Sequence, residues 1–188
     1  MEVAPTEAAP ETSVVSFVAQ KGKSFEQKLY LSDTTGAPSF DNHGPGHADH
    51  NDGGHGSDHH GKEYLRLTLK KNSLLARPDG TPFANNDTVT ITIRVLDPAR
   101  MLFQLEPAGL TFSPSDPAEL RINYDVANGD LDHNGQHDAT DDTLEDHLGI
   151  WVQETPGAPF TRLTSLVAKN TKDIRADLPG FSRYAVSY

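Results

Sequence analysis

The chain has 188 residues, a formal net charge of −11 at pH 7 and no cysteine, which excludes disulfides and thiolate metal sites. It has no run of 18 apolar residues, so no membrane-spanning helix is expected. The acidic surplus is concentrated, because residues 125–147 contain eight Asp or Glu and no Lys or Arg. Such a surface repels nucleic acid and anionic membranes and attracts divalent cations.

The first segment, residues 1–12, is rich in Pro, Glu, Thr and Ala. We expect it to be a flexible tether rather than part of a packed domain. A tether of this composition is typical of the start of a mature exported protein. We therefore expect a targeting or lipid-attachment segment upstream of Glu2 and an extracytoplasmic location, either periplasmic, cell-surface or secreted.

Short segments with alternating apolar residues follow, and they predict β-strands. In Glu63–Lys70 the three leucines Leu65, Leu67 and Leu69 fall on one face, and in Thr88–Leu96 four β-branched residues do the same. The other predicted strands are Val14–Ala19, Phe25–Leu31, Met101–Leu105, Leu120–Tyr124, Gly149–Glu154, Phe160–Leu163, Asp173–Leu178 and Tyr184–Tyr188. Turn residues separate them, which indicates an all-β fold of antiparallel sheets, a sandwich or barrel, formed by residues 13–188 as a single domain.

Residues 130–141 have the spacing of an EF-hand calcium loop. Gly135 at position 6 permits the sharp turn, and Gln136 at position 7 offers its backbone carbonyl. Calcium prefers six to eight hard oxygen ligands, which alternate residues of a tight loop can supply. The predicted calcium ligands are Asp130, Asp132, Asn134, Gln136, Asp138 and Asp141. The alternative is an Asp/Asn/Gly-rich turn that holds no ion.

Two features distinguish this loop from a full EF-hand. Position 12 is Asp141 rather than Glu, as in dockerin-type loops, which the segment resembles. The incoming segment is a predicted strand, and a short helix over Thr140–His147, begun by Thr140 or Asp142, is expected to follow. Dockerins pair two such loops, and this chain has one. We therefore expect a lone loop inserted between two strands of the sandwich, with a structural rather than catalytic ion.

A second polar stretch, residues 41–62, holds six of the nine histidines. Imidazole and carboxylate groups together suit zinc and related transition metals, so His47, His50, His55, His59 and His60 form a candidate zinc site. The alternative is a flexible loop between two strands, because nothing apolar orders these side chains. His133 and His137, at loop positions 4 and 8, are expected to face solvent.

The half of the chain from Thr88 to Tyr188 resembles the zonula-occludens/netrin-receptor module and its bacterial surface-protein relatives. The resemblance rests on Pro107–Phe112, Leu120–Ile122, Trp151 and Phe181–Val186. It implies a β-sandwich used for binding or as a scaffold, with the calcium loop as an insertion. Some members of that family cleave themselves at a His-Phe-Ser sequence. Here Gly180 stands in place of His, so no self-cleavage is expected.

No catalytic constellation is evident, because every histidine lies in a polar loop and the paired carboxylates belong to the calcium loop. We therefore expect a non-catalytic binding or scaffold module with an unidentified protein or surface partner. Two alternatives stay open: a self-assembling subunit of a filament or surface layer, and a zinc-binding protein. Trp151 and the tyrosines are expected to pack in the core rather than to form a platform for sugars.

Overall fold

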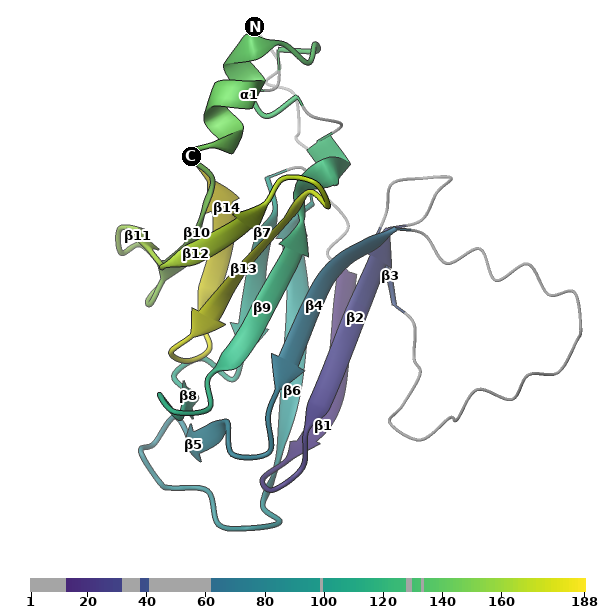
Figure 1. The fold of residues 1–188 in the computed structure, drawn as a ribbon. Helices are drawn as coiled ribbons and strands as arrows, with labels where there is room; N and C mark the ends of the chain where they lie inside the picture. Colours follow the sequence, from purple (N-terminus) through teal and green to yellow (C-terminus); the bar gives the residue numbers. More distant parts are fainter. Residues whose placement is uncertain (1–12, 32–37, 41–61, 99, 128–129, 133) are drawn as a thin grey trace, which may run out of the picture.

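Two antiparallel sheets face each other across the hydrophobic core, as predicted (Figure 1). The computed structural model describes residues 13–31, 38–40, 62–98, 100–127, 130–132 and 134–188. The first sheet contains, in spatial order, β1 (Ser13–Gln20), β6 (Thr88–Asp97), β7 (Leu102–Glu106), β14 (Arg183–Ser187), β10 (Gly149–Gln153) and β11 (Thr161–Arg162). The second contains β12 (Ser165–Ala168), β13 (Asp173–Leu178), β9 (Ala118–Asn123), β4 (Glu63–Leu69), β2 (Phe25–Leu31) and β3 (Pro38–Phe40). β5 (Leu74–Ala76) and β8 (Thr111–Phe112) pair separately.

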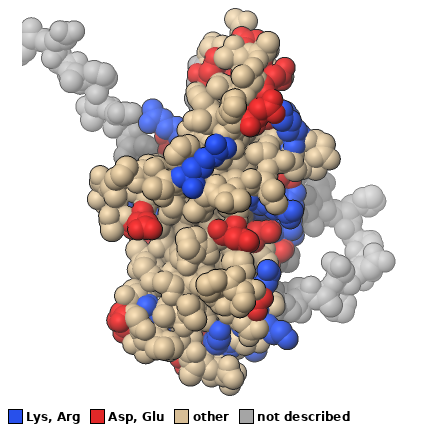
Figure 2. Space-filling model, turned by 60° about the vertical axis from the view of Figure 1, so that its left-hand side comes forward, with Lys and Arg blue, Asp and Glu red and all other residues tan. Residues whose placement is uncertain are grey.

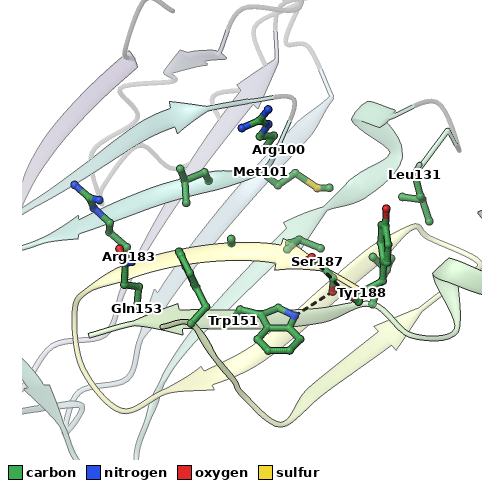
Figure 3. Close-up of a pocket in the computed structure, with 13 residues that line it drawn as sticks. Arg100, Met101, Leu131, Trp151, Gln153, Arg183, Ser187 and Tyr188 are labelled. Carbon is green, nitrogen blue, oxygen red and sulfur yellow. Dashed lines mark hydrogen bonds between the residues drawn. The ribbon is translucent and has the colours of Figure 1, made fainter. Parts of the chain in front are cut away.

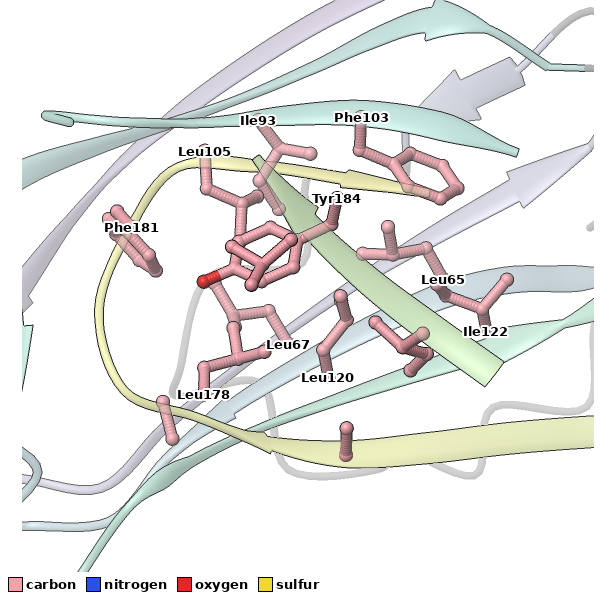
Figure 4. Packing of buried hydrophobic residues seen from close by; sticks show 14 of the residues in the cluster. Leu65, Leu67, Ile93, Phe103, Leu105, Leu120, Ile122, Leu178, Phe181 and Tyr184 are labelled. Atoms are coloured by element: carbon pink, nitrogen blue, oxygen red, sulfur yellow. The ribbon is translucent and has the colours of Figure 1, made fainter. Parts of the chain in front are cut away.

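The strand faces that the alternating apolar residues predicted to be buried do lie in the core. Leu65, Leu67 and Leu69 of β4 are buried, and so are Ile91 and Ile93 of β6. Figure 4 shows how side chains of the two sheets meet between them. Those that it labels include Ile93, Phe103, Leu105 and Tyr184 from the first sheet and Leu65, Leu67, Leu120, Ile122 and Leu178 from the second. Burial of this apolar surface is the main stabilising contribution to such a fold.

Tyr64 departs from the alternation and is also fully buried. The register between β2 and β4 explains why, because Leu29 pairs with Leu65 and Tyr30 pairs with Glu63. Tyr64 is thus the extra residue of a β-bulge, and a bulge redirects the side chain that it inserts. Its ring packs against Phe103, with centroids 5.4 Å apart. Its hydroxyl donates to the Pro98 carbonyl at 2.9 Å, which satisfies the buried polar atom.

The predicted calcium loop lies where the chain passes from the second sheet to the first, between β9 and β10. The predicted incoming strand is present as β9, and a 3-10 turn, η1 (Tyr124–Ala127), lies between it and the loop. The predicted helix is present as α1 (Ala139–Glu145), but its N-cap is Asp138 and not Thr140 or Asp142. The strands β3, β5, β8 and β12 are too short for their periodicity to be visible in the sequence.

The expectation that Trp151 packs in the core is wrong. Trp151 is only partly buried, because it points away from the core between the inward-facing Ile150 and Val152 of β10. Among the tyrosines, Tyr64, Tyr124 and Tyr184 are buried as expected, whereas Tyr188 is 51% exposed. In the described part of the chain, no helix is long and apolar enough to cross a bilayer.

Leu120→Ala tests the core directly. Leu120 is fully buried on β9, the third strand of the second sheet. We expect the free energy of unfolding to fall by about 2–5 kcal/mol, because the substitution removes buried methyl groups and leaves a cavity. Urea denaturation followed by tryptophan fluorescence measures the change. The matched control is Leu166→Ala on β12, since Leu166 is 61% exposed. An equal loss in both variants would contradict the assigned core.

Candidate metal centre

Three carboxylates of the predicted loop converge on one point. One side-chain oxygen each of Asp130, Asp132 and Asp141 lies within 4.8 Å of the other two. Asp141 is buried, and the other two are partly buried. Figure 2 shows that acidic side chains gather at the top of the molecule, over α1 and its loop. Like charges held this close repel one another, so the cluster favours a bound cation.

The first turn of the loop is closed by the carboxylate of Asp130. It accepts hydrogen bonds from the backbone N–H groups of Asn134 at 3.0 Å and Gly135 at 2.9 Å. The Asn134 N–H also donates to Asp132 Oδ1 at 3.0 Å. Gly135 has φ of +89°, a left-handed conformation that a side chain at this position would strain. The turn therefore requires the glycine that the sequence places at position 6.

Asp141 joins the two ends of the loop. Its Oδ1 accepts from the N–H groups of Leu131 at 2.7 Å and Asp132 at 3.2 Å, and its Oδ2 accepts from Asp138 N–H at 2.8 Å. These bonds, first of all that from Asp138, hold the pKa of Asp141 below its usual range. The carboxylate is thus ionised at neutral pH, and its oxygens keep lone pairs for a cation.

The short side chain of Asp141 reaches the start of the loop because the first turn of α1 lies beside it. Asp141 is the third residue of α1, and it forms a capping box with the N-cap residue Asp138. The Asp138 side chain accepts from Thr140 N–H at 2.7 Å, and this bond is the main cause of its lowered pKa. Asp138 is exposed and does not belong to the three-carboxylate group.

Of the four predicted carboxylate ligands, the structure brings together Asp130, Asp132 and Asp141 and leaves Asp138 outside the group. Asn134, Gln136 and Asp138 are exposed. The Asn134 amide donates to Asp132 Oδ2 at 3.0 Å, while its oxygen accepts from Gln136 N–H at 2.8 Å. For Asn134 to act as a ligand, its amide must turn the oxygen towards the carboxylates. Because all of these donors are hard oxygens, the set fits calcium or magnesium better than zinc or copper.

The helix is held on the sandwich by an ion pair that the sequence analysis did not find. Glu145, the last residue of α1, accepts hydrogen bonds from Tyr124 Oη and Lys172 Nζ, each at 2.7 Å. Burial opposes ionisation of Glu145, but the bonds from Lys172 and Tyr124 outweigh it and lower the pKa. No spacing signal connects these residues, since they come from η1, α1 and the segment that precedes β13.

Some of the histidines lie among the residues that the structure describes, and the others do not. His137 is 51% exposed at its side chain and lies 3.5 Å from Asp142, which confirms that it faces solvent. His133 and the candidate zinc ligands His47, His50, His55, His59 and His60 lie outside the described residues. A zinc site there stays a prediction.

Comparisons with protein-family models, with curated proteins and with solved structures gave no match for this chain. The resemblance to the zonula-occludens/netrin-receptor module therefore stays a prediction. The structure does account for Gly180, where the self-cleaving members of that family have His, because a Cβ there would lie 2.5 Å from the Leu110 carbonyl oxygen. Ser182, two residues further on, donates its hydroxyl to the Gln153 carbonyl.

Replacement of Glu145 by Gln tests the ion pair. The pKa of Glu145 is lower in the folded state than in the unfolded chain. Its stabilising contribution is therefore present above about pH 4.5 and is lost as the pH falls through the folded pKa. We expect Glu145→Gln to cost about 1–2 kcal/mol at pH 7, since Lys172 is partly exposed, and much less at pH 3.

Urea denaturation in EDTA at both pH values measures this difference. The control is Glu154→Gln, because Glu154 is exposed. An equal cost of Glu145→Gln at pH 7 and pH 3 would show that the ionised form contributes nothing.

Proposed function

We propose that the chain is a non-catalytic, exported binding or scaffold module whose loop 130–141 holds one structural calcium ion. The convergence of Asp130, Asp132 and Asp141 carries the proposal. Three carboxylates around one point supply charged, hard oxygens, and loop positions 5, 7 and 9 can add further oxygen ligands. The millimolar calcium outside cells suffices for even a weak site of this kind.

The ion's role is to neutralise the loop and fix the path between the sheets. The carboxylate of Asp141 already accepts three backbone N–H groups. A cation at the cluster would remove the repulsion that opposes this arrangement.

Calcium is expected to raise the melting temperature, and EDTA to lower it. At a calcium concentration a hundredfold above the dissociation constant, binding adds about 2.7 kcal/mol, or about 5–10 °C for a chain of this size. Differential scanning calorimetry measures the shift. Asp132→Asn should abolish most of it, because the amide retains an oxygen for Asn134 N–H but loses the charge.

The matched control is Asp142→Asn, which removes the same charge from α1 outside the cluster and should keep the calcium response. Asp141→Asn should destabilise the protein even in EDTA, since Asp141 accepts three backbone N–H groups. A melting temperature that calcium does not change would refute the calcium site.

A self-assembling subunit is the second candidate, and the edge strand β1 favours it. In the described part of the chain β1 pairs on one side only, with β6. Val14 and Val18 on this strand are 39% and 60% exposed. An open, apolar edge can pair with another copy.

If the chain assembles through β1, we expect it to form oligomers, and we expect Val18→Lys to convert them to monomers. Size-exclusion chromatography with light scattering over a range of concentrations measures the mass. Asn85→Lys, in an exposed turn, adds the same charge elsewhere and should leave the oligomers intact. A monomer at every concentration would exclude assembly through this edge.

A further inference from the structure

A groove of about 600 Å³ lies along the outer face of the first sheet and reaches buried residues of the core, among them Met101 and Leu131. Its floor includes Leu102, Ala185 and Trp151, which are direct neighbours across β7, β14 and β10. Figure 3 shows the groove between this sheet face and the loop that carries Arg100 and Met101. Its volume lies within the range of small-ligand sites, about 300–1,000 Å³.

Aromatic rings from three segments border the groove. The indole N–H of Trp151 donates to the Ser187 carbonyl at 3.2 Å, which fixes the orientation of the ring (Figure 3). Because Ala185 has only a methyl group, it leaves the space beside the indole open. Phe160, from the turn before β11, is 36% exposed, and Tyr188 is half-exposed. A ring held as that of Trp151 is offers an apolar face at a low entropic cost.

The charge of the groove is opposite to that of the whole chain. Arg100 and Arg183 line it, and among the described residues no acidic side chain does, although the net charge is −11. Arg100 lies 3.7 Å from Asp97, so Arg183 contributes the larger share of the positive charge. Arg183 donates its Nε–H to the side-chain oxygen of Gln104 at 3.3 Å. Because this amide is neutral, the bond does not neutralise the positive charge of the guanidinium group. Gln153 donates through its amide nitrogen to the Ala158 carbonyl at 2.8 Å, which leaves its side-chain oxygen as an acceptor.

We propose that this groove binds a short acidic oligosaccharide. The apolar face of a pyranose ring would stack on Trp151, its carboxylate would pair with Arg183, and a hydroxyl would donate to Gln153. This inference deepens the proposed binding function and rests on it. The positive groove on an acidic protein selects an anionic over a neutral sugar.

A peptide fits the same groove less well. The backbone groups of β14 are engaged in ladders with β7 and β10, one on each side. A peptide laid across them would bury its own N–H and C=O groups without backbone partners. The hydroxyl groups of a saccharide also need partners, but they can rotate towards solvent or towards the side-chain donors and acceptors of the groove.

The groove is also connected to the calcium loop. Leu131, at loop position 2, is buried and lines the groove (Figure 3). Leu148 lines it too. The backbone N–H of Leu131 donates to Asp141. Ordering of the loop by calcium would therefore place one wall of the groove, and saccharide affinity should fall in EDTA.

Isothermal titration calorimetry of the whole chain in calcium tests the proposal. The probes are trisaccharides of galacturonate, glucuronate and mannuronate, each with its carboxyl-reduced neutral counterpart, and a tri-glutamate peptide. At least one acidic trisaccharide should bind, and its neutral counterpart should bind at least tenfold more weakly. Arg183→Gln and Trp151→Ala should each weaken binding about tenfold or more.

The matched control is Arg175→Gln on β13 of the second sheet, where Arg175 lies 3.9 Å from Glu119; it should leave binding unchanged. The proposal is overturned if no acidic trisaccharide binds, if the neutral sugars or the peptide bind as tightly, or if Arg183→Gln has no effect. The calorimetric melting temperature in calcium is measured on the same sample. A normal calcium response without saccharide binding refutes the groove alone, whereas saccharide binding without a calcium response refutes the metal site alone.

Discussion

The buried carboxylate of Asp141 controls how the chain crosses between the two sheets. Between β9 and β10 the backbone must leave one layer, turn and enter the other, and a segment of this kind has few ladder bonds. Asp141 compensates by accepting the N–H groups of Leu131, Asp132 and Asp138 at once. The same side chain belongs to the acidic cluster. Closure of the loop and attraction of a cation are therefore two consequences of one placement.

The loop of residues 130–141 and the helix α1 together form a lobe, which is attached to the sandwich by one polar and one apolar contact region. Glu145 is bound by Tyr124 and Lys172, and Leu131 and Leu148, which precede and follow α1, are buried in the hydrophobic core cluster. A polar and an apolar attachment together define the position of the lobe better than either would alone. The acidic loop is thus presented at one end of the sandwich.

The strands with strong alternation could be predicted from the sequence, and so could the ligand spacing of the loop, because both depend on local periodicity. Tyr64 could not be placed, since its burial depends on a bulge set by pairing with β2. The Glu145–Lys172 pair, 27 residues apart, is likewise a product of tertiary structure. The prediction for Trp151 was wrong because its neighbours Ile150 and Val152 face the core, and alternate residues of a strand face opposite sides. In a strand of five residues that are nearly all apolar, the sequence does not show which alternate set faces the core. The groove therefore became visible only in three dimensions.

The place of β14 in the first sheet has a consequence for the order of folding. This strand comes last in the described chain, yet it lies between β7 and β10, in the interior of the sheet. Until residues 183–187 have left the ribosome, β7 and β10 have no neighbour to join them, and the core lacks Tyr184. Pairings over such separations are slow to form. The two parts of the first sheet are consequently joined only when β14 is added.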